Sequence, residues 1–180
     1  MAAHYLIPMN RRSFIVTMLG GAAVMAGSIT FGKAGFTMGL FDKKKDAPKG
    51  DFPFTLSDAE WRTRLSPEAY HVLRDHGTER AFTSPLNDEK RAGVFHCAGC
   101  DQPLYDAATK FNSGTGWPSF WAPISDAAIG TSTDYKIGVP RTECHCSNCG
   151  GHLGHVFDDG PKPTGKRHCL NGVCLTFKPA

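Results

Sequence analysis

Cysteine is the residue type with the most chemistry to offer in this chain of 180 residues, which contains seven of them. Four of the seven form two C-x-x-C pairs, and a spacer of two residues lets a tight turn direct both sulfurs of a pair at one ion. Four thiolates suit tetrahedral zinc, and a closed four-sulfur site leaves no coordination position for water. We therefore predict a structural zinc site with the ligands Cys97, Cys100, Cys146 and Cys149. The alternatives are two redox pairs or two disulfides, which an oxidising compartment would favour.

A fifth cysteine, Cys169, directly follows Lys166, Arg167 and His168. The thiolate is the nucleophilic form of cysteine, and neighbouring cations lower the pKa of the thiol. Cys169 is therefore a candidate attacking nucleophile. Because side chains alternate between the two faces of a strand, the three preceding residues cannot all point at its sulfur.

Two histidines, His152 and His155, lie three residues apart in a glycine-rich segment upstream of Cys169. Imidazole can donate or relay a proton near neutral pH, which would assist a nucleophilic attack. Spacing alone leaves three interpretations open for each of them: catalysis, zinc ligation or a hydrogen-bonded place in the core.

Two tryptophans, Trp117 and Trp121, occur among turn-forming residues. Large aromatic side chains are most often part of a core, so a core cluster is the simpler interpretation. A surface that receives a substrate is the alternative.

The elements that position these residues are expected to be two short helices followed by short strands. Ser57 and Glu60 fit a capping box, and a Ser-Pro-Glu sequence at Ser66 predicts a second helix that runs to Gly77. From Gly93 onward, short segments with Val, Phe and Tyr alternate with Gly, Pro, Asn and Asp, which is typical of antiparallel strands. The sequence thus predicts a mainly β domain.

The folded part of the chain is expected to be one domain over residues 51–180, because a chain of this length is too short for two large cores. Residues 51–180 hold thirteen Lys and Arg against fifteen Asp and Glu. Affinity for nucleic acid comes from clustered Lys and Arg, so we expect no nucleic-acid partner. Residues 36–50 are predicted to be a solvated linker, since the stretch after Asp42 is charged and has no apolar periodicity.

The N-terminal residues 1–35 resemble a twin-arginine export signal, in which Arg11 and Arg12 stand at the head of a weakly apolar run that reaches Gly32. The alternative is an uncleaved anchor, because about twenty mostly apolar residues just suffice to span a bilayer. We expect export to a bacterial periplasm, with membrane contact only if this segment is retained.

The order of the motifs resembles one known family. C-x-x-C is followed by S-G-T-G-W-P-S-F, R-T-E-x-x-C-x-x-C, G-H-L-G-H-V-F and R-H-C-L-N-G, as in the B-type methionine-R-sulfoxide reductases. The resemblance runs from about Phe54 to Phe177. It implies a repair enzyme with two small antiparallel sheets, short N-terminal helices and a structural zinc site formed by the four cysteines of the C-x-x-C pairs.

The resemblance also assigns site residues. The attacking cysteine falls on Cys169, and the other catalytic positions fall on His152, His155 and Asn171. The positions that bind the substrate fall on Trp117 and Arg167.

In the implied reaction, the Cys169 thiolate attacks the sulfur of methionine-R-sulfoxide in an oxidised protein. His155, assisted by His152, protonates the oxygen; methionine is released and Cys169 becomes a sulfenic acid. Trp117 would supply an apolar face for the methyl group while polar donors hold the oxygen, which selects one epimer at the chiral sulfur.

The chain departs from the family pattern at Thr115, where many members carry a recycling cysteine. Five residues separate Cys174 from Cys169, about 16 Å along a strand, whereas bridged Cα atoms lie about 4.4–6.8 Å apart. We therefore expect Cys174 to be buried. Cys144 is expected to lie near the zinc or to act as a remote resolving thiol. We expect an external thiol or thioredoxin-like donor to recycle the enzyme. His168, at a position often aromatic in the family, could change the polarity of the pocket or place a cation beside Cys169.

Two other functions remain open on the residues alone. A zinc-bound interaction module would need the C-x-x-C pairs but neither Cys169 nor Trp117. A disulfide oxidoreductase would use the C-x-x-C pairs as redox centres, but no thioredoxin-like βαβ pattern surrounds either pair.

Overall fold

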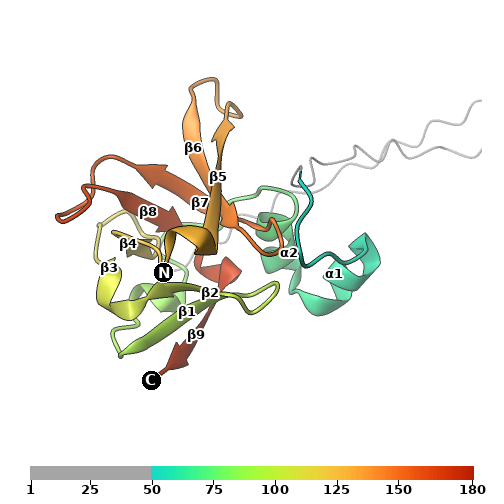
Figure 1. The fold of residues 1–180 in the computed structure, drawn as a ribbon, viewed down its shortest axis with the longest axis horizontal. Helices are drawn as coiled ribbons and strands as arrows, with labels where there is room; N and C mark the ends of the chain where they lie inside the picture. Colours follow the sequence, from blue (N-terminus) through green and yellow to red (C-terminus); the bar gives the residue numbers. More distant parts are fainter. Residues whose placement is uncertain (1–49) are drawn as a thin grey trace, which may run out of the picture. The chain divides into compact units, whose positions relative to one another are not determined.

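Two short helices open the part of the chain that the computed structural model describes, residues 50–180 (Figure 1). The predicted signal or anchor, and the linker up to residue 49, lie outside these described residues. Helix α1 spans Asp58–Arg64 and begins with the predicted capping box between Ser57 and Glu60. Helix α2 spans Pro67–Leu73, and the Ser66 side chain accepts a hydrogen bond from the Ala69 N–H. Within residues 50–180, no helix has both the length and the apolar character needed to cross a membrane.

The predicted end of the second helix at Gly77 is wrong, because α2 stops at Leu73. His76 adopts a left-handed backbone with φ of 52°. The Gly77 N–H then donates to the His71 carbonyl, so the chain turns away from the helix axis. This reversal brings His76 toward the strands that follow later in the sequence.

The strands form two antiparallel sheets, which confirms the predicted mainly β architecture (Figure 1). The smaller sheet has the order β2-β1-β9, with β1 at Gly93–Cys97, β2 at Pro103–Asp106 and β9 at Leu175–Pro179. The larger sheet has the order β3-β4-β8-β7-β6-β5; its strands are β3 Lys110–Phe111, β4 Ser119–Phe120, β5 Ile129–Asp134, β6 Arg141–Cys146, β7 His152–Phe157 and β8 Arg167–Leu170. Short 3-10 turns connect them: η1 Pro85–Asn87, η2 Ala107–Thr109, η3 Asp126–Ala128 and η4 Gly172–Cys174.

An aromatic cluster joins the two sheets. Phe95 of β1, Tyr105 of β2 and Phe120 of β4 have no exposed surface. The ring centroids of Phe95 and Phe120 are 4.9 Å apart, and those of Tyr105 and Phe120 are 4.6 Å apart. Each fully buried large apolar side chain contributes about 1.5–3 kcal/mol, so this cluster fixes one sheet against the other.

A glycine on β7 is required by the close approach of β8. Gly154 lies opposite Leu170, and a Cβ at position 154 would lie 2.0 Å from the Cys169 carbonyl oxygen. Gly154→Ala should therefore lower the free energy of unfolding by about 1–3 kcal/mol or more, because two backbones would have to separate. Urea denaturation followed by circular dichroism measures this loss.

The matched control is Thr133→Ala, at an exposed position of the edge strand β5. It should change stability by no more than about 0.5 kcal/mol. Equal unfolding midpoints for the two variants would show that the strands are not held this closely.

Candidate active site and metal centre

The four cysteines of the two C-x-x-C pairs form one cluster. Their sulfur atoms all lie within 4.8 Å of one another. The Sγ atoms of Cys97 and Cys149 are 3.7 Å apart, and those of Cys100 and Cys146 are 3.5 Å apart. A tetrahedral ion with metal–sulfur bonds of about 2.3 Å separates its sulfurs by about 3.8 Å, so the cluster has the size that a zinc ion requires.

The two cysteine turns have the same backbone construction. The Asp101 N–H donates to the Cys97 carbonyl, and the Gly150 N–H donates to the Cys146 carbonyl, both at 2.8 Å. Asp101 and Gly150 are both left-handed, with φ of 64° and 68°. The turns thus close in the same way at the ends of β1 and β6, and both direct their sulfurs at a common point.

The register of the larger sheet places one row of side chains across five strands. Cys169 of β8 lies opposite His155 of β7 and opposite Ser119 of β4. His155 in turn lies opposite Glu143 of β6, and Glu143 opposite Ser132 of β5. Residues that are directly opposite in an antiparallel pair project from the same face, so these five side chains share one face of the sheet.

Hydroxyl groups surround the sulfur of Cys169 on the β4 side. The Thr115 hydroxyl lies 3.8 Å from the Cys169 Sγ and 2.8 Å from the Ser113 hydroxyl. Ser113 continues the chain to Ser119 at 2.8 Å. Thr115 occupies the position where many relatives of this motif have a recycling cysteine, and the geometry shows that a thiol at this position would be next to Cys169.

The Arg167 guanidinium is held on the same face as Cys169, two residues away on β8. It donates two hydrogen bonds to Asp159, at 2.8 and 2.9 Å, and its Cζ lies 4.3 Å from the centroid of the Phe157 ring. The hydrogen bonds to Asp159 and the proximity of Cys169 raise the pKa of Arg167. A fixed positive charge therefore lies near the sulfur of Cys169.

His155 is paired with a carboxylate through Nε2, which lies 2.8 Å from Asp134 Oδ2. Burial lowers the pKa of His155, and the hydrogen bond to Asp134 opposes this shift. Burial by itself would raise the pKa of Asp134, but the Lys136 N–H, His155 and Arg141 bring it well below its usual range. The ionised Asp134 thus orients the ring of His155.

His152 is paired with a second carboxylate, through Nδ1. Its Nδ1 lies 2.8 Å from Glu143 Oε1, while Glu143 Oε2 accepts from His145 Nδ1 and from the Ser132 hydroxyl at 2.8 and 2.9 Å. Only 3% of Glu143 is exposed. Burial alone would raise the pKa of Glu143, but the two histidines bring it down to about 2, so the group is a buried carboxylate with cationic or N–H partners on both oxygens.

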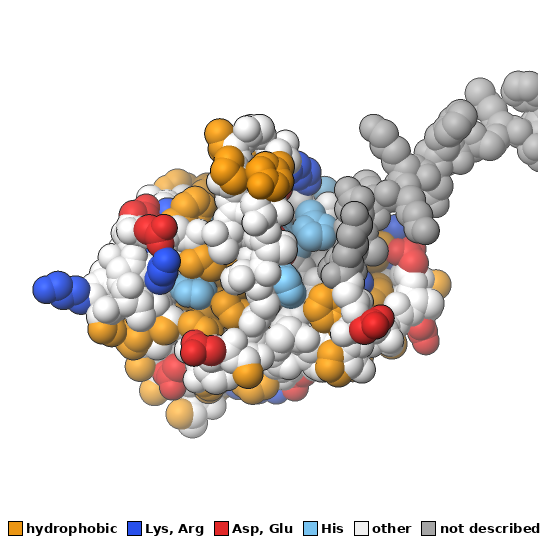
Figure 2. Space-filling view, turned by 45° about the horizontal axis from the view of Figure 1, so that its top comes forward, with side chains coloured by type: hydrophobic (Ala, Val, Ile, Leu, Met, Phe, Trp, Pro, Cys, Tyr) orange, Lys and Arg blue, Asp and Glu red, His pale blue; other side chains and the backbone are white. Residues whose placement is uncertain are grey.

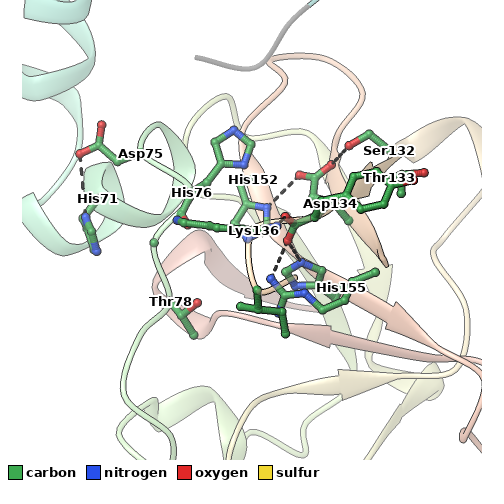
Figure 3. Close-up of a pocket in the computed structure, with 15 residues that line it drawn as sticks. His71, Asp75, His76, Thr78, Ser132, Thr133, Asp134, Lys136, His152 and His155 are labelled. Atoms are coloured by element: carbon green, nitrogen blue, oxygen red, sulfur yellow. Dashed lines mark hydrogen bonds and ion pairs between the residues drawn. The ribbon is translucent and has the colours of Figure 1, made fainter. Parts of the chain in front are cut away.

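These histidines form the floor of an open cleft of about 1170 Å³ (Figure 3). One wall is the β5–β6 hairpin with Asp134, Lys136 and Ile137, and the opposite wall is the segment that follows α2, with His76 and Thr78. Cys169 is not among the lining residues, but its opposite neighbour His155 is. The cleft therefore leads from the surface to the edge of the row that contains Cys169.

The tip of the β5–β6 hairpin exposes three large apolar side chains. Tyr135, Ile137 and Val139 are 68%, 62% and 55% exposed. Tyr135 and Ile137 also line the cleft. Figure 2 shows apolar side chains on a raised part of the surface and histidine side chains exposed nearby. An apolar rim of this kind could contact a polypeptide whose side chain enters the cleft.

The structure places Trp117 in a second hollow of about 490 Å³, lined also by Phe82 and Gly116. The indole N–H of Trp117 donates to the Glu79 carbonyl at 3.2 Å. Trp117 and the two histidines thus line different hollows, and Thr78 lines the hollow of the histidines.

Asn171 is buried and connects this backbone to the sheet. Its Nδ2 donates to the Leu153 carbonyl and its Oδ1 accepts from the Glu79 N–H, both at 2.9 Å. The Glu79 carboxylate in turn accepts from the N–H groups of Gly172 and Val173. Asn171 therefore holds Glu79, whose carbonyl accepts the hydrogen bond from the Trp117 indole. Asn171 is not among the residues that line the cleft of the histidines.

Two further cysteines are buried away from both centres. Cys174 has no exposed surface and donates to the His152 carbonyl, which agrees with its predicted burial. Cys144 is also fully buried and lies 3.5 Å from the Tyr105 hydroxyl, outside the four-cysteine cluster. The bulge in the β6–β7 pairing adds Leu153 to β7, while β6 itself stays regularly paired with β5 from Cys144 to Cys146. Burial raises the pKa of both thiols, to about 12 for Cys144.

Sequence reasoning missed the acidic partners of the site. Asp134 orients His155, Glu143 orients His152, and Asp159 orients Arg167. The Glu79 carbonyl accepts a hydrogen bond from the Trp117 indole. A signal was present for Glu143, which is the carboxylate of the R-T-E motif and falls inside a strand. For Asp134 no local signal exists, because its partners Arg141 and His155 lie on other strands.

His168 does not place a cation beside Cys169. It lies on the opposite face of β8 and shares a hydrogen bond of 3.1 Å with the hydroxyl of the buried Tyr105. Burial lowers the pKa of His168 to about 4, so the ring is neutral near pH 7.

This burial of a neutral histidine predicts a pH-dependent loss of stability. The unfolded residue binds a proton below about pH 6.5, whereas the folded residue does not until about pH 4, so acidification favours the unfolded state in this window. From about pH 7 to about pH 5.5, wild type should lose about 1 kcal/mol more unfolding free energy than His168→Phe. Urea denaturation of both proteins at the two pH values measures the difference, and parallel losses would contradict it.

Comparisons with known proteins agree with the motif order. Residues 65–179 match the model of the SelR domain family. A peptide methionine sulfoxide reductase MsrB of Pseudomonas putida (strain W619) is 59% identical over 120 residues, which cover 67% of this chain and 90% of the relative. The protein of the same name from Agrobacterium fabrum is 53% identical over 68% of this chain and 91% of its own length. The chloroplastic peptide methionine sulfoxide reductase B1 of Arabidopsis thaliana is 51% identical over 74% of this chain and 66% of its own length. The chain belongs to the SelR family, among the peptide methionine sulfoxide reductases MsrB.

Proposed function

We propose that this protein reduces methionine-R-sulfoxide in oxidised proteins to methionine, with Cys169 as the attacking nucleophile. The observation that carries the proposal is the sheet face on which Cys169 lies two residues from Arg167 and opposite His155, which lines an open cleft. A positive charge next to a thiol, and an oriented imidazole across the strand, are what a nucleophile and its proton donor need.

The reaction transfers two electrons. The Cys169 thiolate attacks the sulfoxide sulfur, and the oxygen takes up two protons and leaves as water when the sulfur–oxygen bond breaks. Water then attacks the Cys169 sulfur of the resulting sulfur–sulfur bonded sulfonium, which breaks the sulfur–sulfur bond and releases one proton. The sulfoxide sulfur is thereby reduced to the thioether of methionine, and the sulfur of Cys169 is oxidised to a sulfenic acid. Net atoms and electrons balance, because one thiol and one sulfoxide give one sulfenic acid and one methionine.

The two histidines are proposed to handle the proton. His155 faces Cys169 across the strand pair and is oriented by Asp134, which makes it the nearest candidate acid. The ring of His152 packs against that of His155, with centroids 5.4 Å apart, and the contact of its Nδ1 with Glu143 Oε1 orients the ring. His152 is thus a reserve of protons for His155.

Selection of the R epimer would come from groups on different sides of the chiral sulfur. Trp117 is proposed to contact the methyl group, and the Arg167 side chain and neighbouring hydroxyls to face the oxygen. Since the Trp117 indole donates to the Glu79 carbonyl and Asn171 accepts from the Glu79 N–H, we propose that Asn171 and Glu79 set the position of the indole ring.

The recycling step is proposed to use an external donor. The sulfenic acid reacts with one donor thiol to give a mixed disulfide and water, and a second donor thiol releases Cys169 and leaves a disulfide on the donor. Thr115 cannot supply an internal thiol next to Cys169, and Cys144 and Cys174 are fully buried. A small thiol or a thioredoxin-like protein must therefore reach Cys169 from solvent.

We further propose that the four-cysteine cluster holds zinc and that residues 1–35 direct export to a periplasm. The cluster dimensions suit tetrahedral zinc, and a four-sulfur site supplies cross-linking but no catalytic position. The ion would join the turn after β1 to the turn after β6. Twin-arginine export carries folded proteins, so zinc could be loaded before the thiols meet an oxidising environment.

Substitution of Cys169 tests the reaction. The full-length protein is incubated with a peptide carrying either the R or the S epimer of methionine sulfoxide, with dithiothreitol or a thioredoxin system as reductant. Wild type should consume only the R epimer. Cys169→Ser should lose at least about a hundredfold in rate, because a hydroxyl is not ionised at neutral pH.

Cys174→Ala is the matched control, since it removes a thiol that is buried outside the row. It should retain turnover with both reductants. If neither epimer is consumed by folded, metal-loaded wild type, the reductase assignment fails and an interaction module becomes the better account. If Cys174→Ala completes only a single turnover, the proposed external recycling is wrong.

Metal content and location can be tested on one preparation. The full chain is expressed in a bacterium with twin-arginine transport, the exported fraction is purified, and zinc, free thiols and disulfides are counted by elemental analysis and mass spectrometry. We expect about one tightly bound zinc per chain with the four cysteines reduced. The variant with Arg11→Lys and Arg12→Lys should remain inside the cell with the same zinc content.

Two outcomes would contradict these proposals separately. Disulfides in place of zinc in the exported protein would refute the metal assignment. Equal export of the wild type and the arginine variant would refute the twin-arginine signal without affecting the zinc assignment.

A further inference from the structure

A second group of metal-ligating side chains lies at the cleft, apart from the four cysteines. One nitrogen of His76, one nitrogen of His152 and one carboxylate oxygen of Glu143 all lie within 4.8 Å of one another. Figure 3 shows His76 and His152 side by side at the cleft. Two histidines and one carboxylate form the ligand set of zinc sites that keep a coordination position open to solvent.

The contact between His152 and Glu143 already has nearly the dimensions of a metal site. Their Nδ1 and Oε1 atoms are 2.8 Å apart and share one proton. Two ligands that are each about 2.0–2.1 Å from a zinc ion lie about 2.9–3.3 Å apart for angles between 90° and the tetrahedral value. An ion could therefore replace this proton after a shift of a few tenths of an ångström. The other oxygen of Glu143 would keep its bonds to His145 and Ser132, which orient the carboxylate.

His76 is held toward this pair by an unusual backbone. Its φ of 52° is uncommon for a residue other than glycine, and such strain often marks a functional position. The ring centroid of His76 is 5.0 Å from that of His152, with 31° between the planes. Within residues 50–180 we find no hydrogen bond to the His76 ring, so its nitrogens are available to a ligand that enters the cleft.

The charges around the cluster set what it can bind. The ionised Glu143 supplies one negative charge at the site. Lys136 opposes a cation, since its Nζ donates to the His76 carbonyl at 2.9 Å, but this side chain is exposed and can turn into solvent. Imidazole nitrogen and carboxylate oxygen suit borderline divalent ions, and zinc is the ion that we choose for the test because the contact between His152 and Glu143 fits its bond lengths.

We propose that His76, Glu143 and His152 form a second, solvent-accessible site that binds a divalent zinc ion reversibly. Binding at this site does not depend on the proposed reductase function. Its consequence does: an ion on His152 would occupy a group proposed to supply protons and would stand in the cleft through which the substrate side chain approaches, so zinc would act as a reversible inhibitor.

The binding test uses the full-length Cys169→Ser variant, because this substitution removes the half-buried thiol as a competing ligand. The tightly bound metal of the variant is measured beforehand. Isothermal titration calorimetry with zinc chloride should detect one further zinc per chain. His76→Asn, which tolerates the left-handed backbone but lacks imidazole, should weaken this binding by at least about tenfold. His71→Asn is the control, because His71 lies at the rim of the same cleft outside the cluster, and it should bind like the parent.

The results separate the site from the reaction. Absence of a further zinc, or equal affinity in His76→Asn and His71→Asn, would overturn the second site. In the protein with Cys169 intact, added zinc should inhibit reduction of the R sulfoxide, a chelator should restore it, and His76→Asn should resist inhibition. A protein that binds the further zinc but reduces neither epimer without it would refute the proposed function and leave the second site standing.

Discussion

The register of β6, β7 and β8 is the constraint on which the rest of the site depends. Antiparallel pairing puts Glu143, His155 and Cys169 directly opposite one another, so they project from one face of the sheet. A slip of one residue would move Cys169 to the face that packs on the aromatic core and bring His168 out in its place. Gly154 permits this register, because no side chain fits between its backbone and the Cys169 carbonyl.

The same strands connect the four-cysteine cluster to the row that contains Cys169. Strand β6 carries both Glu143 and Cys146, and Cys149 precedes the strand β7 that begins at His152. A zinc ion in the cluster would therefore close the turn between β6 and β7 and hold the pairing that aligns Glu143 with His155. It would also tie that turn to the end of β1, so the two sheets would be joined by a cross-link as well as by apolar packing.

Buried and half-buried carboxylates fix the positions of the basic side chains on the polar face of the sheet. A buried charge is costly unless it is paired, and Glu143 and Asp134 each have several N–H or cationic partners. The pairing is directional, because it fixes which nitrogen of each histidine remains available. On the opposite face of the sheet, the neutral His168 and the buried Cys144 belong to the core around Tyr105. Polar chemistry and packing are thus separated by the alternation of side chains along the strands.

The sequence by itself determined which four cysteines cluster, the capping box of α1 and the mainly β architecture, because each depends on short spacings or on repeated local patterns. The motif order identified the family, which the comparisons confirmed. Only the tertiary structure decided the partners of the histidines, since Asp134 and Glu143 reach them across strands. It also placed Trp117 in a different hollow from the two histidines and brought His76 to His152 through a left-handed turn. No local pattern encodes contacts between residues so far apart in the chain.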